Sequence, residues 1–188
     1  MKVLGLRCSS KDYAFGVLGG ALASPDVLDS GLVMFPKGFS RVQSVKWFLQ
    51  ELDSLLSKHQ CDLIIIKGFE GRTRDKSFVE RVEHEAIAFL AAANHGIKMV
   101  LRKVKSTIAK DLGLKGRARY LSSTLDTSHV PNFADYPDKI QEAILAVWSG
   151  LNRTTGHSYT QAASCESSSG AGSARRRAWS AAVTSGVE

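Results

Sequence analysis

The chain has 188 residues, of which 44% are hydrophobic, and its formal net charge at pH 7 is +7. This is enough apolar material for the core of one globular domain. No run of about 18 uncharged apolar residues occurs, which excludes a purely apolar transmembrane helix, and the N-terminus lacks the basic and long apolar pattern of a signal peptide, so we expect a cytoplasmic protein.

The first part of the chain predicts a β-hairpin, a third strand and a long helix. Residues 2–8 and 13–20 are rich in Val, Leu, Phe and Tyr, and the polar stretch 9–12 separates them as a turn. A third strand is expected at 27–35, between Pro25 and Pro36. Ser40 is a favourable N-cap for the next helix, in which apolar residues recur every three to four positions as far as Leu56.

A buried parallel strand is the clearest feature of the second part. Residues 63–66 read LIII, which is typical of a strand covered on both faces. Helices are expected at 77–94, 104–112 and 138–151, with a short strand at 97–101. The order β-β-β-α-β-α-β-α-α predicts an α/β fold in which a five-stranded mixed sheet, an antiparallel meander followed by βαβ crossovers, is flanked by helices.

The composition changes after residue 152. We expect residues 1–152 to form the domain. The remainder is dominated by Gly, Ser, Ala and Thr with an Arg175-Arg176-Arg177 run, and it has no sustained apolar period. Such a segment buries too little surface to offset its ordering entropy, so 153–188 is expected to be a disordered Ser/Ala/Gly/Arg tail. A non-native or frameshifted reading of the end of the gene would give a similar composition.

The positive charge is concentrated in the middle of the chain. Residues 67–119 contain 13 Lys and Arg against 6 Asp and Glu, which gives this segment alone a net charge of +7. An excess of this kind favours an anionic partner such as nucleic acid, although a solvated basic face without a partner has the same composition. Two predicted strands also end in cations, the first in Arg7 and the fourth in Lys67.

Six short motifs occur in order along the chain: VLGLR at 3–7, GVL at 16–18, DLIIIK at 62–67, VKST at 104–107, GLK at 113–115 and EAI at 142–144. Together they resemble the RuvC-type Holliday-junction resolvases, which have an RNase H-like fold. The resemblance covers residues 1–150. The chain is also similar to a group of uncharacterised bacterial proteins with the same fold and a degenerate metal site, in which a lysine likewise follows the fourth strand.

The resemblance implies a metal site of four acids that hold two Mg²⁺ ions for phosphodiester cleavage. Its four positions fall on Arg7, Lys67, Lys139 and Glu142, of which only Glu142 is an acid. Asp138, four residues earlier on the same helical face, is a candidate substitute ligand. An arginine offers only donors, whereas Mg²⁺ needs oxygen ligands. We therefore expect no metal here, and instead a salt bridge from Arg7 or Lys67 to Glu142 and Asp138.

Other acids leave an alternative open. A rearranged Mg²⁺ site built from Glu70, Asp138 and Glu142 would make the protein an active structure-specific endonuclease with Mg²⁺ as its cofactor. The sequence favours the simpler interpretation that Glu70 and the acids at 80, 83 and 85 balance neighbouring basic residues such as Arg81 on the surface.

Basic residues supply the second set of candidate site residues. Lys105 and the stretch 115–119 match positions that contact phosphates in the resolvases, so the resemblance implies nucleic-acid binding. Such contacts would be salt-sensitive and largely independent of sequence. The candidates are Arg72, Arg74, Lys76, Lys103, Lys105, Lys115, Arg117 and Arg119.

The sequence thus favours a pseudoenzyme, an RNase H-like protein that binds nucleic acid without a cofactor or membrane contact. A protein-interaction module without a nucleic-acid role is the second alternative. The resolvases include dimers, so the resemblance also allows a homodimer.

Overall fold

The computed structural model describes residues 1–70, 76–114 and 124–151. These residues form one mixed sheet with helices on both faces. The strands are β1 (Val3–Cys8), β2 (Asp12–Ala21), β3 (Ser24–Met34), β4 (Leu63–Lys67) and β5 (Val100–Lys103). The helices are α1 (Arg41–His59), α2 (Lys76–Asn94), α3 (Lys105–Asp111) and α5 (Asp138–Trp148), with a 3-10 turn, η2 (Phe133–Asp135), before α5.

The strand order is β3-β2-β1-β4-β5, which confirms the predicted five-stranded mixed sheet. Strands β1, β2 and β3 form an antiparallel meander, while β4 pairs in parallel with both β1 and β5. All five residues of β4 are buried, as the apolar run predicts for a central strand. Because β1 and β4 are parallel neighbours, their carboxyl ends meet at one edge of the sheet.

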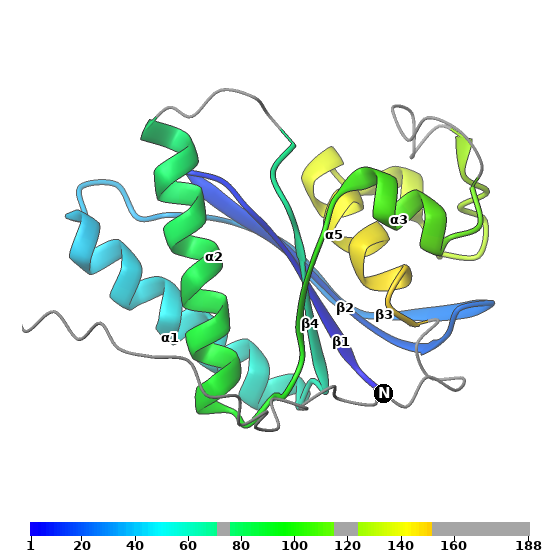
Figure 1. The fold of residues 1–188 in the computed structure, drawn as a ribbon, viewed down its shortest axis with the longest axis horizontal. Coiled ribbons are helices and arrows are strands. Elements are labelled where there is room, and N and C mark those ends of the chain that lie inside the picture. The colour runs from blue at the N-terminus through cyan, green and yellow to red at the C-terminus, as the bar shows by residue number, and fades with distance from the viewer. Residues whose placement is uncertain (71–75, 115–123, 152–188) are drawn as a thin grey trace, which may run out of the picture. The chain divides into compact units, whose positions relative to one another are not determined.

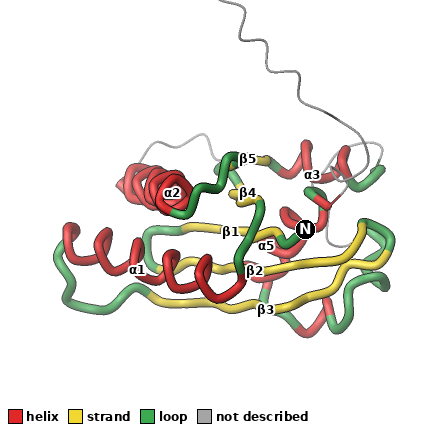
Figure 2. Tube along the Cα trace, turned by 90° about the horizontal axis from the view of Figure 1, so that it is seen from below, coloured by secondary structure: helices red, strands yellow, loops and turns green. Residues whose placement is uncertain are grey.

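Helices α1 and α2 cover one face of the sheet, and α5 packs on the other (Figures 1 and 2). Side chains alternate between these faces along each strand. In β1, Leu4 and Leu6 belong to the core beneath α1 and α2, whereas Val3 belongs to the core beneath α5. Arg7 comes four residues after Val3, an even number, so its side chain also points to the α5 face.

Two glycines let α5 lie close to the sheet. A Cβ atom on Gly5 would lie 2.2 Å from Val147 Cγ2 and 2.5 Å from the carbonyl oxygen of Ala143, and one on Gly16 would lie 3.1 Å from Ile144 Cγ1. Any side chain at Gly5 would push α5 away from β1. This close contact brings the first turns of α5 within reach of Arg7.

The predicted start of α1 is confirmed in detail. The Ser40 hydroxyl accepts a hydrogen bond from the Gln43 backbone N–H, and the Gln43 side chain accepts one from the Ser40 backbone N–H. This reciprocal capping box satisfies two N–H groups that have no partner within the helix.

The main difference from the predicted elements is at β5. The strand was expected at 97–101 and lies at Val100–Lys103, because its pairing with β4 runs from Ile64 opposite Val100 to Lys67 opposite Lys103. Ile97 packs instead against the core beneath α1 and α2. The last helix also ends three residues early, at Trp148.

None of the helices that the structure describes has the length and apolar composition needed to span a bilayer. The expectations for the tail at 153–188 fall outside the described residues, and the homodimer stays a prediction.

Candidate functional site

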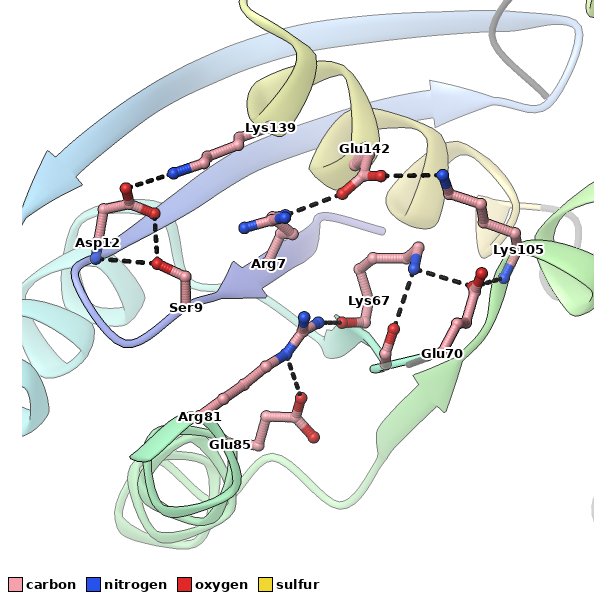
Figure 3. Close-up of polar contacts among 11 residues, drawn as sticks. Arg7, Ser9, Asp12, Lys67, Glu70, Arg81, Glu85, Lys105, Lys139 and Glu142 are labelled. Atoms are coloured by element: carbon pink, nitrogen blue, oxygen red, sulfur yellow. Dashed lines mark hydrogen bonds and ion pairs between the residues drawn. The ribbon is translucent and has the colours of Figure 1, made fainter. Parts of the chain in front are cut away.

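The candidate site lies at the edge of the sheet where β1 and β4 end. Arg7 and Lys67 reach this edge from the two strands, and Lys139 and Glu142 reach it from α5 (Figure 3). All four positions implied by the resemblance are thus near one another in space, although they are up to 135 residues apart in the sequence.

Glu142 lies between two cations. Its Oε2 atom accepts a hydrogen bond from Arg7 Nε at 2.8 Å, and its Oε1 atom lies 3.3 Å from Lys105 Nζ (Figure 3). Burial alone would raise the pKa of the Glu142 carboxyl. The hydrogen bond from Arg7 and the charges of Lys67, Arg7 and Lys105 outweigh burial and hold that pKa below its usual value. Glu142 is therefore ionised at neutral pH.

The expected salt bridge is present between Arg7 and Glu142, but Asp138 takes no part in it. Asp138 is exposed at the start of α5 and makes no ion pair with any residue that the structure describes. Lys67 also pairs elsewhere. Asp138 and Glu142 share one face of the helix, but only the carboxylate of Glu142 contacts the cations.

Lys67 turns toward the loop after β4. Its Nζ atom donates to the Glu70 carboxylate and to the Gly68 carbonyl oxygen, each at 2.9 Å, and its side chain is only 6% exposed. The same Glu70 oxygen accepts a hydrogen bond from the backbone N–H of Lys105. Glu70 thus links the end of β4 to the first residue of α3.

Lys139 pairs with Asp12 at the start of β2. The other oxygen of that carboxylate accepts a hydrogen bond of 2.7 Å from the Ser9 hydroxyl, which in turn accepts one from the Asp12 backbone N–H at 3.1 Å. No spacing in the sequence indicates this pair, because Lys139 and Asp12 are 127 residues apart and meet only where α5 packs on β2.

A second ion-pair group supports the end of β4 from the α2 side. Glu85 Oε1 lies 3.1 Å from Arg81 Nε, and Glu85 Oε2 lies 2.7 Å from Arg102 Nη2. Arg81 Nη2 also donates to the carbonyl oxygen of Lys67 at 2.6 Å. Glu85 is 2% exposed. The interpretation of Glu85 and Arg81 as surface charges was therefore wrong: they are buried because α2 packs directly over β4.

His84 forms a buried polar contact next to this group. Arg41 Nη1 donates to its Nε2 atom at 3.0 Å, so His84 Nδ1 carries the proton and donates to the carbonyl oxygen of Ser9, also at 3.0 Å. Its ring stacks on Phe35 with centroids 4.2 Å apart. Burial and the positive charge of Arg41 lower its pKa to about 4, although the Ser9 carbonyl and Glu83 act in the opposite direction.

This contact should make stability depend on pH. Between pH 6.5 and about 4 the unfolded chain binds a proton at His84 that the folded chain does not, so the free energy of unfolding should fall by about 3 kcal/mol as the pH decreases through this window. Urea unfolding at several pH values checks this, with His84→Gln as the comparison because its amide can replace both hydrogen bonds. An equally steep decline in that variant would show that other groups cause it.

The described acids do not fit the two-magnesium site that the resemblance implies. Both oxygens of Glu142 contact cations, and both oxygens of Asp12 are in hydrogen bonds. Within residues 1–70, 76–114 and 124–151, no three His, Cys, Asp or Glu side chains are grouped so that they could hold a metal ion. Glu70, Asp138 and Glu142 are thus not assembled into the rearranged site of the nuclease alternative.

The predicted phosphate-contacting residues have different environments. Lys105 is partly exposed at the start of α3. Lys103 is 3% exposed, lies 2.7 Å from Asp111 and donates to the backbone and side-chain oxygens of Ser149, so it holds β5 to α3 and α5. The remaining candidates lie outside the part of the chain that the structure describes: the whole residue in the case of Arg72, Arg74, Lys115, Arg117 and Arg119, and the side chain in the case of Lys76.

No protein-family model matches the sequence, and no curated protein sequence matches it significantly. Solved structures do match the fold. RuvC of Thermus thermophilus in complex with a Holliday junction substrate aligns with a TM-score of 0.64 and 13% identity, over 83% of this chain and 96% of RuvC. A second structure of RuvC from Thermus thermophilus aligns with a TM-score of 0.65 and 11% identity, over 81% of this chain and 95% of RuvC.

The yeast mitochondrial Holliday junction resolvase Ydc2 aligns with a TM-score of 0.54 and 12% identity, over 80% of this chain and 77% of Ydc2. Identities this low establish a shared fold and leave activity to the site residues. The chain therefore has the RNase H-like fold of the RuvC-type Holliday junction resolvases, without a sequence match that assigns it to a family.

Proposed function

We propose that this protein binds nucleic acid through basic residues of the segment 67–119 and does not carry out two-metal phosphodiester cleavage. The observation that carries the proposal is the ion pair between Arg7 and Glu142, joined by Lys105, at the carboxyl ends of β1 and β4. It supports a role in which protein cations take the place of metal ions next to a nucleic-acid backbone.

The positive charge next to Glu142 opposes metal-dependent cleavage. Mg²⁺ requires oxygen ligands at about 2.0 to 2.1 Å, and an arginine side chain has none to offer. Two unit positive charges about 4 Å apart repel each other by roughly 4 kcal/mol at an effective dielectric constant of about 20. Arg7 and Lys105 contact the one acid retained from the resolvase pattern, so a metal at Glu142 would have to displace both of them.

The fold and the charge of the protein together support nucleic-acid binding. RuvC of Thermus thermophilus, with the same fold, is solved with a Holliday junction substrate. In this chain, the excess of positive charge lies in residues 67–119, which include Lys105 beside Glu142. Cations at such positions neutralise phosphates and release counterions, which gives binding without base readout.

Fluorescence anisotropy over a salt series tests the binding. Labelled duplex, single-stranded and four-way DNA should bind at low salt, and the logarithm of the association constant should fall by about 0.9 for each phosphate neutralised per unit of log salt concentration. Lys105→Gln should reduce this slope by about one unit. Lys58→Gln is the matched control, because Lys58 also forms a carboxylate pair, with Asp29 at 2.7 Å, but on α1.

Absence of binding to all three DNAs at low salt would remove this proposal and favour the protein-interaction module. Binding with a slope that neither variant changes would place the contacts away from Lys105.

A further inference from the structure

The Glu142 carboxylate contacts two cations at the same time. Its two oxygens meet cations from two different elements, Arg7 of β1 and Lys105 of α3. A phosphodiester likewise presents two unesterified oxygens that share one negative charge, and arginine binds such oxyanions through directed N–H groups. Figure 3 shows the Glu142 carboxylate between the side chains of Arg7 and Lys105, with the side chain of Lys67 below them in this view.

The cations at this edge are matched by acids within the fold. Four cationic side chains and three carboxylates face one another, so the group has a net charge of only +1. The members are Arg7, Lys67, Lys105, Lys139, Asp12, Glu70 and Glu142. An external phosphate can therefore gain full contact with these cations only where one of the internal carboxylates moves away.

Of these three carboxylates, only that of Glu142 is both partly exposed and without a hydrogen bond to the backbone. Asp12 is nearly buried and bonded to Ser9, and Glu70 accepts a backbone N–H at the start of α3. The partners of Glu142 are both side chains, and its own side chain is 26% exposed. It can rotate toward solvent without breaking a backbone hydrogen bond.

We propose that Arg7 and Lys105 form a phosphate-binding site that Glu142 fills from within the chain, and that a backbone phosphate of the nucleic acid displaces the Glu142 carboxylate. This inference rests on the proposed function and deepens it, because it identifies where one phosphate binds. Glu142 then has two roles: it keeps the two cations assembled in the free protein, and it weakens binding by competing with the ligand.

Glu142→Gln tests the competition, with pyrophosphate and labelled duplex DNA as probes. Loss of the negative charge should tighten binding of both probes by at least about fivefold, as expected when charge-assisted contacts become available to the ligand. Asp53→Asn is the matched control. It also raises the net charge by one, but Asp53 pairs with His95, which follows the C-terminal end of α2. The effect of this substitution on the affinity for either probe should therefore be much smaller.

A second substitution shows whether the gain comes from these cations. Adding Arg7→Gln to Glu142→Gln should abolish the gain. In the wild type, millimolar pyrophosphate should shift the NMR signal of the Arg7 side-chain N–H, which keeps the test independent of how well the variants fold. Equal affinities for Glu142→Gln and Asp53→Asn, or an Arg7 signal that does not move, would overturn the inference.

The two proposals can fail separately. Salt-sensitive DNA binding by the wild type without any gain in Glu142→Gln would retain the proposed function and remove the phosphate site. Tighter pyrophosphate binding in Glu142→Gln without DNA binding by either protein would retain the phosphate site and remove the proposed function.

Discussion

Replacing Arg7 with Asp and Lys67 with Glu together is expected to raise the affinity for Mg²⁺ by at least two orders of magnitude. Each substitution exchanges a cation at the ends of β1 and β4 for a carboxylate, next to the existing acid Glu142. At close range, each exchange replaces a repulsion of Mg²⁺ by an attraction worth roughly 4 kcal/mol per charge. This is more than the expected gain requires, because 1.4 kcal/mol is a factor of about ten in affinity. Isothermal titration with MgCl₂ measures the change.

The neutral double variant, Arg7→Gln with Lys67→Gln, separates two effects. It removes the positive charges without supplying oxygen anions, so its Mg²⁺ affinity should lie between those of the wild type and the acidic variant. If the acidic variant binds Mg²⁺ no better than the wild type does, the backbone geometry needed for a metal site has been lost together with the acids.

Replacing Glu85 with Gln is expected to lower the free energy of unfolding by about 3 kcal/mol, because removal of one member of a buried ion pair leaves the other charge without compensation. Arg81 bears most of this cost, since Arg102 is half exposed and can be hydrated. Urea denaturation should show a lower midpoint at an unchanged slope. Since Arg81 also holds the carbonyl oxygen of Lys67, the end of β4 should lose protection from hydrogen exchange.

Glu83→Gln is the control for this substitution. It makes the same chemical change two residues earlier in α2, at an exposed pair with Arg41. Exposed pairs contribute less than about 1 kcal/mol, so the control should unfold nearly as the wild type does. Similar losses in both variants would contradict the assignment of a special role to the buried pair.

The fold could be predicted from the sequence because its signals are local. The run at 63–66 specifies a strand buried on both faces, and Ser40 with Gln43 specifies the start of α1; each element is decided by residues adjacent in the chain. Strand β5 was shifted in the prediction because its register depends on pairing with β4, which is not a local property.

The site was only partly predictable. The sequence gives the charges of Arg7, Lys67 and Glu142, and their positions at strand ends and on α5 follow from the fold. Which cation meets which acid depends on side-chain directions across the sheet. Lys67 pairs with Glu70 and Lys139 with Asp12, while Asp138 faces solvent, and no spacing in the sequence specifies these choices. The i, i+4 spacing of Arg81 and Glu85 was a signal for their pair, but not for its burial.

We propose that protein cations take the place of metal ions at this site, so that nucleic acid is bound but not cut. Incubation of labelled four-way DNA with the wild-type protein and Mg²⁺ or Mn²⁺ tests it most directly. The expected result is a retarded complex from which the DNA is recovered intact. Metal-dependent incision that disappears in Glu142→Ala would contradict the claim.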